Sequence, residues 1–218
     1  FLQGISRERV GMEMTKILTG ENVHSIIDQM SSLGVLDRVF EDIHVELPPE
    51  LSTEYLVNLA LLFRNSELSG EDLASKMRDL LVLSKNDLLE ISIMHECRYL
   101  NLDVTIESAR RFHAAVPNRR KRLIMGYLGK NGIETQKFEE LFTSINSKDL
   151  VLKPIVDGKR LAIVTGLAPG PRLGKLKGWL HRRQVEEASR TEDEVLRFLS
   201  EIDWKSSDYQ EWRALSWP

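Results

Sequence analysis

Cysteine is almost missing from the sequence, and long apolar runs are missing altogether. Cys97 is the one cysteine in 218 residues, so no disulfide can form within the chain, and a reducing compartment (cytoplasm, nucleus or mitochondrial matrix) is favoured over secretion. Even the apolar stretch Leu80–Leu83 is flanked by Arg78, Asp79 and Lys85. A membrane-spanning helix needs about 20 apolar residues, so we expect a soluble chain with no membrane partner.

The residue patterns of common catalytic and metal sites are also missing. The 5 histidines form no His-Glu-x-x-His motif and no paired-cysteine arrangement, so we expect no metal site. The sequence has no Gly-x-x-x-x-Gly-Lys phosphate loop and no Asp-x-Asp pair, which is the pattern that two-metal nucleotidyl transfer requires. We expect Cys97 to be a small buried apolar residue, with a reactive thiol as the alternative. No catalytic residue, metal or cofactor is predicted in this chain.

The sequence does contain an uneven distribution of charge. The net charge is only −3, yet residues 119–183 hold 15 lysines and arginines against 5 acidic residues. A basic segment inside an acidic chain indicates a polyanionic partner such as RNA, although a solvated helix face gives the same pattern. One basic run in this segment would contact phosphates or act as a nuclear localisation signal: Arg119, Arg120, Lys121 and Arg122.

Apolar residues recur at helical spacing along most of the chain, and strand patterns are nearly absent. Ser6 is placed as an N-cap, and Thr191 with Glu194 forms a capping-box pattern. The sequence therefore predicts an all-α fold without a substantial sheet. The expected helices cover residues 6–20, 22–34, 52–63, 69–83, 85–100, 104–116, 119–128, 135–144, 173–188 and 191–199, with a short further turn at 35–40.

Two connections rich in proline and glycine, at residues 153–158 and 166–171, indicate a boundary near residue 150. The second connection leads into a helix through Gly170. Its backbone N–H groups would approach a phosphate, with Arg172 and Lys175 adding positive charge. A loop that only turns the chain is the alternative. Trp179 and Trp204 are expected to pack in a core. Trp212 and Trp217 could stack on bases or pack in a core as well.

Several segments resemble the class II tRNA nucleotidyltransferases, the CCA-adding enzymes, in their eukaryotic, fungal-like form. Gly4-Ile5-Ser6-Arg7-Glu8-Arg9-Val10-Gly11-Met12-Glu13-Met14 is similar to the last recognised motif of that family. Residues 33–40 resemble the end of the family's neck, and residues 157–160 and 169–176 resemble its tail. The similarity is to the carboxy-terminal part of these enzymes, without the catalytic head.

The resemblance implies a helical neck at residues 1–45, a body at 46–150 and a tail at 151–218 that binds the tRNA elbow. It implies that the parent enzyme adds CCA, CC or A to tRNA 3′ ends, with CTP, ATP and Mg²⁺ bound by the head. Four neck residues would support the nucleotide site: Arg7, Glu8, Arg9 and Glu13. The implied tRNA contacts are Arg119, Arg120, Lys121, Arg122, Lys159, Arg160, Gly170, Arg172, Lys175 and Lys177.

Two other interpretations stay open at this point. A helical protein-interaction scaffold would share helix patterns with the family and take no part in nucleotidyl transfer. A bacterial-type poly(A) polymerase would share the head chemistry but fits the tail segments less well. The sequence begins at Phe1 and not at a methionine, so we expect a truncated or processed chain in which a targeting peptide would not be visible.

Overall fold

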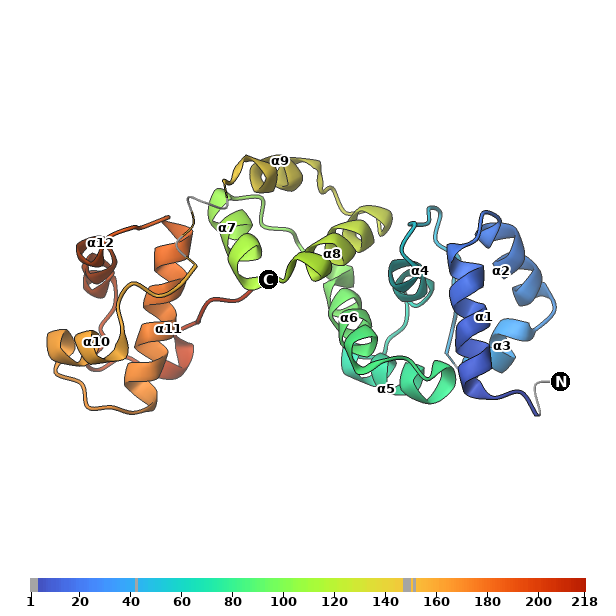
Figure 1. Ribbon diagram of the computed structural model, residues 1–218, viewed down its shortest axis with the longest axis horizontal. Coiled ribbons are helices and arrows are strands. Elements are labelled where there is room, and N and C mark those ends of the chain that lie inside the picture. Colours follow the sequence, from blue (N-terminus) through green and yellow to red (C-terminus); the bar gives the residue numbers. More distant parts are fainter. Residues whose placement is uncertain (1–3, 42, 147–149, 151) are drawn as a thin grey trace. The chain divides into compact units, whose positions relative to one another are not determined.

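The computed structural model describes residues 4–41, 43–146, 150 and 152–218. These residues form α-helices joined by short loops and contain no strand, so the predicted all-α class is confirmed (Figure 1). The helices are α1 (Arg7–Thr19), α2 (Val23–Ser32), α3 (Val35–Phe40), α4 (Tyr55–Leu62), α5 (Gly70–Leu81), α6 (Lys85–Glu96), α7 (Ile106–Ala115), α8 (Asn118–Lys130), α9 (Gln136–Ser144), α10 (Gly158–Thr165), α11 (Pro171–Glu186) and α12 (Glu192–Arg197). Short 3₁₀ helices cover Cys97–Tyr99, Phe198–Glu201 and Tyr209–Glu211.

The predicted caps are present where the sequence placed them. The Ser6 hydroxyl accepts a hydrogen bond from the backbone N–H of Arg9 at 3.3 Å and so caps α1. Thr191 and Glu194 form the full capping box ahead of α12. Each of these bonds satisfies a backbone group that the first helical turn leaves unpaired. Local sequence therefore fixes where these helices begin.

One helix was not predicted. Residues 158–165 lie between the two predicted connections and form α10, which Asp157 caps by accepting from the Arg160 N–H at 2.8 Å. Gly166 ends the helix in the left-handed conformation, with φ at 72°. Only Leu161 and Thr165 of α10 are buried, so the apolar spacing that predicts longer helices is absent here.

The chain divides into two compact units. Unit 1 comprises residues 1–102 and 119–135, and unit 2 comprises residues 103–118 and 136–218. Unit 1 thus combines α1–α6 with α8, and unit 2 combines α7 with α9–α12. Each unit is made of two separate stretches of the chain, whereas the neck, body and tail were predicted as three continuous segments. The boundaries of these three segments stay a prediction.

A close crossing of α1 and α5 organises unit 1. Gly11 on α1 faces the end of α5, where an added Cβ would lie 2.2 Å from the carbonyl oxygen of Leu81. Glycine is therefore the residue that this crossing permits. Beyond the crossing, Phe40 and Phe63 pack edge to face with their ring centroids 5.0 Å apart in the core.

A buried amide ties α1 to α4 in the same unit. The Asn58 side chain donates to the carbonyls of Leu18 at 2.7 Å and Ser52 at 2.8 Å, and it accepts from the Ser52 N–H. Asn58 is fully buried, and its amide is satisfied by these three bonds. The bonds to Ser52 also hold residues 52–54 outside α4, which is why the predicted helix over 52–63 begins at Tyr55.

Helix α11 is the centre of unit 2, where it packs against α7, α10 and α12. Its buried side chains Leu173, Leu176 and Leu180 form a core with Val195 and Trp212. Trp179 and Trp204 pack against this core, as predicted for both. The indole of Trp217 lies 4.5 Å from the Phe112 ring on α7, centroid to centroid, so this tryptophan also packs within the unit.

Candidate nucleic-acid interface

The charged residues of the family-like motif lie at the surface of α1, which buries Val10, Met14 and Leu18 on its other side. The predicted nucleotide-site supports are Arg7, Glu8, Arg9 and Glu13. Arg7 pairs with the exposed Glu41 at 2.8 Å, and Glu13 pairs with Lys16 at 3.0 Å. Among the described residues, Glu8 and Arg9 have no side-chain partner. Their charged groups are thus accessible, and their supporting role stays a prediction.

The basic run on α8 is engaged by acids of its own unit. Its three arginines form ion pairs of 2.7 to 2.9 Å: Arg119 with Asp87, Arg120 with Glu90, and Arg122 with Glu54. Lys121 is buried, and burial lowers the pKa of its ammonium group. A cation already paired with a carboxylate attracts a phosphate less strongly. The three ion pairs hold α8 within unit 1, and the contact of the four residues with RNA stays a prediction.

The predicted lysines of unit 2 are more accessible. Lys159 on α10 and Lys175 on α11 are exposed, and neither has an acidic partner within the described part of the chain. Lys177, also on α11, is half-buried. Arg160 is exposed but pairs with Glu192 at 2.5 Å. Lys159 and Lys175 are therefore the predicted contacts whose charge is most available to a phosphate.

The start of α11 is open to solvent. Gly170 is its N-cap and offers no side-chain hydrogen bond, and Pro171 occupies the first turn. A Cβ added at Gly170 would meet no atom within 4 Å. The first-turn N–H groups of such a helix are unpaired within the helix and favour an anion. This geometry agrees with the predicted role of Gly170, which stays a prediction.

Arg172 is committed to holding the fold of unit 2. Its guanidinium donates to the carbonyl of Trp204 at 3.0 Å and also to the carbonyl of Ser207. It lies over the rings of Tyr209 and Trp212, at 5.4 and 5.3 Å from their centroids. Sequence reasoning placed this arginine at the surface next to a phosphate. A charge reversal at Arg172 would therefore disturb the fold as well as any RNA contact.

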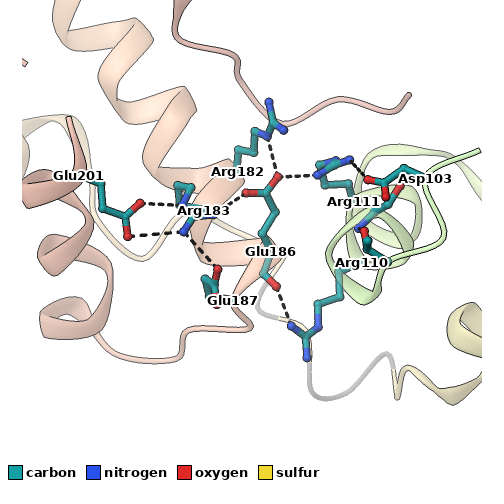
Figure 2. A network of polar contacts seen from close by, with 10 residues as sticks. Asp103, Arg110, Arg111, Arg182, Arg183, Glu186, Glu187 and Glu201 are labelled. Atoms are coloured by element: carbon teal, nitrogen blue, oxygen red, sulfur yellow. Dashed lines mark hydrogen bonds and ion pairs between the residues drawn. The ribbon is translucent and has the colours of Figure 1, made fainter. Parts of the chain in front are cut away.

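A buried carboxylate surrounded by arginines was not foreseen (Figure 2). Glu186 is only 4% exposed. Its Oε1 accepts from Arg111 of α7 at 2.7 Å and from Arg182 at 2.8 Å, and its Oε2 accepts from Arg183 at 3.1 Å. Arg110 donates to the Glu186 backbone carbonyl at 2.6 Å. The spacing of Arg182 and Arg183 from Glu186 is visible in the sequence, but the pairing with Arg110 and Arg111, about 75 residues away, is not.

Burial raises the pKa of Glu186, but hydrogen bonds from Arg182 and Arg111 and the adjacent positive charges outweigh this effect. The net result is a pKa below the ordinary value of 4.5. Glu186 is thus ionised at neutral pH and serves as the common acceptor of the cluster. Arg183 is balanced further by Glu187 at 3.1 Å and Glu201 at 3.2 Å.

Side chains that often carry catalysis or bind metals are placed for packing. Cys97 is buried, as predicted, and burial raises the pKa of its thiol to about 11, which opposes thiolate formation at neutral pH. His95 is buried, and its Nε2 lies 2.9 Å from the carbonyl of Leu68. The described residues contain no group of three His, Cys, Asp or Glu side chains arranged to hold a metal ion. They also include no helix of the length and hydropathy that a membrane span requires.

Comparison with known proteins gives two matches. Residues 1–47 match the family model described as the probable RNA and SrmB binding site of polymerase A. Over 81 residues the chain is 35% identical to the mitochondrial CCA tRNA nucleotidyltransferase of Saccharomyces cerevisiae. That match covers 32% of this chain and 15% of the yeast protein, so the chain spans only a small part of that relative. No solved structure matches. The comparisons confirm the resemblance drawn from the sequence: this chain is similar to a part of a CCA-adding enzyme.

Proposed function

We propose that this chain is the tRNA-holding part of a tRNA nucleotidyltransferase that adds CCA, CC or A to tRNA 3′ ends. The observation that carries the proposal is the match of residues 1–47 to an RNA-binding region, together with the 35% identity to a CCA-adding enzyme. The chain would position tRNA, and CTP, ATP and Mg²⁺ would bind in a catalytic head whose Asp-x-Asp carboxylates are not in this sequence. The yeast relative is mitochondrial, which makes the mitochondrial matrix one compartment for this proposal.

Recognition would depend on the shape of tRNA and on its phosphates. Lys159, Lys175 and the open start of α11 at Gly170 supply unpaired positive charge and N–H donors within unit 2. Such groups bind a phosphate backbone without reading its sequence, because they contact no base edge. The arginines of α8 are ion-paired with acids of unit 1, so we expect them to contribute less than the unpaired lysines. The proposed RNA-contacting surface is therefore smaller than the full basic segment at residues 119–183.

The first experiment measures tRNA binding against salt. Between about 50 and 200 mM salt we expect the affinity to fall about ten-fold or more, since each phosphate contact releases condensed counterions. Single-stranded RNA of unrelated sequence and equal length is the competitor. Equal affinity for that RNA and for tRNA would contradict recognition by tRNA shape.

Charge reversal locates the contact. Lys175→Glu and Lys159→Glu should each weaken tRNA binding several-fold and reduce the salt dependence, while far-UV circular dichroism stays unchanged. Lys76→Glu is the matched control, because Lys76 is an exposed lysine of α5 that has no acidic partner in the described part of the chain. If all three variants bind tRNA like the wild type, a protein-interaction scaffold becomes the better explanation.

A third experiment tests whether the chain is catalytically incomplete. Incubated with tRNA lacking its 3′ end and with labelled CTP, ATP and Mg²⁺, the chain alone should incorporate no label. Incorporation by the purified chain would show that it has catalytic carboxylates of its own. A full-length CCA-adding enzyme in a parallel reaction confirms that the tRNA and nucleotides are competent.

A further inference from the structure

One aromatic ring is held in solvent on unit 1. Tyr99 ends the 3₁₀ helix Cys97–Tyr99 and is 76% exposed. It is the one exposed aromatic side chain among the residues that the structure describes. Its hydroxyl has no partner there. Tyrosine usually buries part of its ring, so a ring left in water on a well-ordered turn indicates a contact that the isolated chain does not show.

The turn that carries Tyr99 is rigidly held through Arg98. The Arg98 guanidinium donates to the carbonyl of His95 at 2.8 Å and to the carbonyl of Leu68 at 3.2 Å. The Arg98 carbonyl in turn accepts from the Asn131 amide of the α8 end at 2.9 Å. These bonds join the turn to two other segments of unit 1. The exposed ring is therefore supported by an ordered backbone, and a ligand would not have to order the loop.

The cation of Arg98 lies against the ring. Its guanidinium carbon is 4.9 Å from the Tyr99 ring centroid, which is cation–π geometry. The ring thus combines exposure to solvent with a cation against it.

Resting on the function proposed above, we propose that Tyr99 is a stacking platform for an unpaired base of the bound RNA. An aromatic face with an adjacent arginine is the arrangement that accepts a base without selecting its identity, because every base has a π-face. A protein partner would favour a ring within a larger apolar patch. The exposed neighbours of Tyr99 in the chain, Glu96 and Asn101, are not apolar, so the ring is not part of such a patch.

The test compares Tyr99→Ala with Tyr99→Phe and Tyr99→Trp in the full chain, with a tRNA transcript as the probe. Tyr99→Ala should weaken binding about five-fold or more, whereas the two aromatic variants should stay within about two-fold of the wild type. Leu33→Ala is the matched control, because Leu33 is an apolar side chain of the same unit that is 77% exposed. All four variants should unfold at the wild-type temperature.

A salt titration separates this contact from the phosphate contacts. Stacking releases no counterion, so Tyr99→Ala should lower the affinity without changing the slope of log K against log salt, whereas Lys175→Glu should reduce that slope. Wild-type affinity for Tyr99→Ala, or an equal loss in Tyr99→Phe, would overturn the stacking role. Wild-type protein that fails to bind tRNA would instead overturn the proposed function, and the stacking role with it.

Discussion

At the scale of single residues, Glu186 shows how one buried charge joins two helices. Arg111 comes from α7 and Arg182 from α11, and both donate to the same carboxylate oxygen, Oε1. Removing a buried carboxylate leaves its cationic partners without that counter-charge, which costs more than the ion pair itself contributes. Glu186 is therefore the residue of unit 2 whose charge should matter most for stability.

We predict that Glu186→Gln lowers the free energy of unfolding of unit 2 by about 3 kcal/mol, because Arg111, Arg182 and Arg183 lose their shared anion. Glu187→Gln is the control. The Glu187 side chain is 43% exposed, so its loss should change stability by about 0.5 kcal/mol or less. Urea unfolding followed by tryptophan fluorescence measures both variants. Equal stabilities of the two variants would contradict the role assigned to Glu186.

The same residue predicts acid sensitivity. The pKa of Glu186 is lowered in the folded chain, so its contribution to stability is fully present above its ordinary value of 4.5 and is lost as pH falls through the lower folded pKa. Unit 2 should thus lose stability below about pH 4.5, and Glu186→Gln should lack this part of the pH dependence. Unfolding curves collected from pH 7 to pH 3 compare the two proteins.

At the scale of elements, the crossing of α1 and α5 explains a glycine within the family-like motif. A methyl group at Gly11 would lie 2.2 Å from the Leu81 carbonyl oxygen, closer than any real Cβ contact. The neighbour is backbone and cannot rotate away, so the helices would have to separate.

We predict that Gly11→Ala destabilises unit 1 by about 2 kcal/mol or more through this overlap, despite the higher helix propensity of alanine. Gly174→Ala on α11 is the control. A Cβ there meets nothing within 4 Å, so that variant should be slightly stabilised. Thermal unfolding followed by far-UV circular dichroism measures both. A harmless Gly11→Ala would show that α1 and α5 do not approach closely.

Arg172 joins another pair of elements, the start of α11 and the segment from Trp204 to Trp212. Arg172→Ala would leave the carbonyls of Trp204 and Ser207 without their donor, so unit 2 should lose about 1 to 3 kcal/mol. Lys175→Ala, three residues along the same helix, should lose about 0.5 kcal/mol or less. Tryptophan emission during urea unfolding reports the difference. Equal stability of the two variants would show that Arg172 is not structural.

At the scale of the whole molecule, the two units have separate cores, and their aromatic composition differs. All four tryptophans, Trp179, Trp204, Trp212 and Trp217, belong to unit 2, whereas helices of both units contribute to the circular dichroism signal. Tryptophan fluorescence, excited at about 295 nm, therefore reports the unfolding of unit 2 only.

We predict that Gly11→Ala separates the two signals. Part of the circular dichroism change should move to a lower urea concentration, and the fluorescence transition should stay where it is in the wild type. Two signals that shift together would show that the units unfold as one cooperative body. Glu186→Gln should produce the opposite order, with fluorescence changing first.

Local sequence was enough to predict the fold class and most helices, because apolar spacing and capping residues act within a few positions. Ser6, Thr191 and Glu194 cap the predicted helices, and the burial of Cys97 and the packing of Trp179 and Trp204 against a core follow from their apolar side chains. The resemblance of residues 4–14 to the family motif was likewise visible in the amino-acid sequence. Helix α10 was missed, since a short helix with two buried residues has too little periodicity.

Tertiary structure decided which charges are available. The sequence does not show which partners these basic residues have, because the partners lie about 30 to 70 residues away in the chain. Acidic side chains pair with Arg119, Arg120 and Arg122, and backbone carbonyls accept hydrogen bonds from Arg172. The grouping of Arg110 and Arg111 with Glu186 and the exposed position of Tyr99 were equally invisible. A charged side chain is available to a ligand only where the fold leaves it unpaired. The sequence does not show this, because an ion pair joins segments that are far apart in the chain.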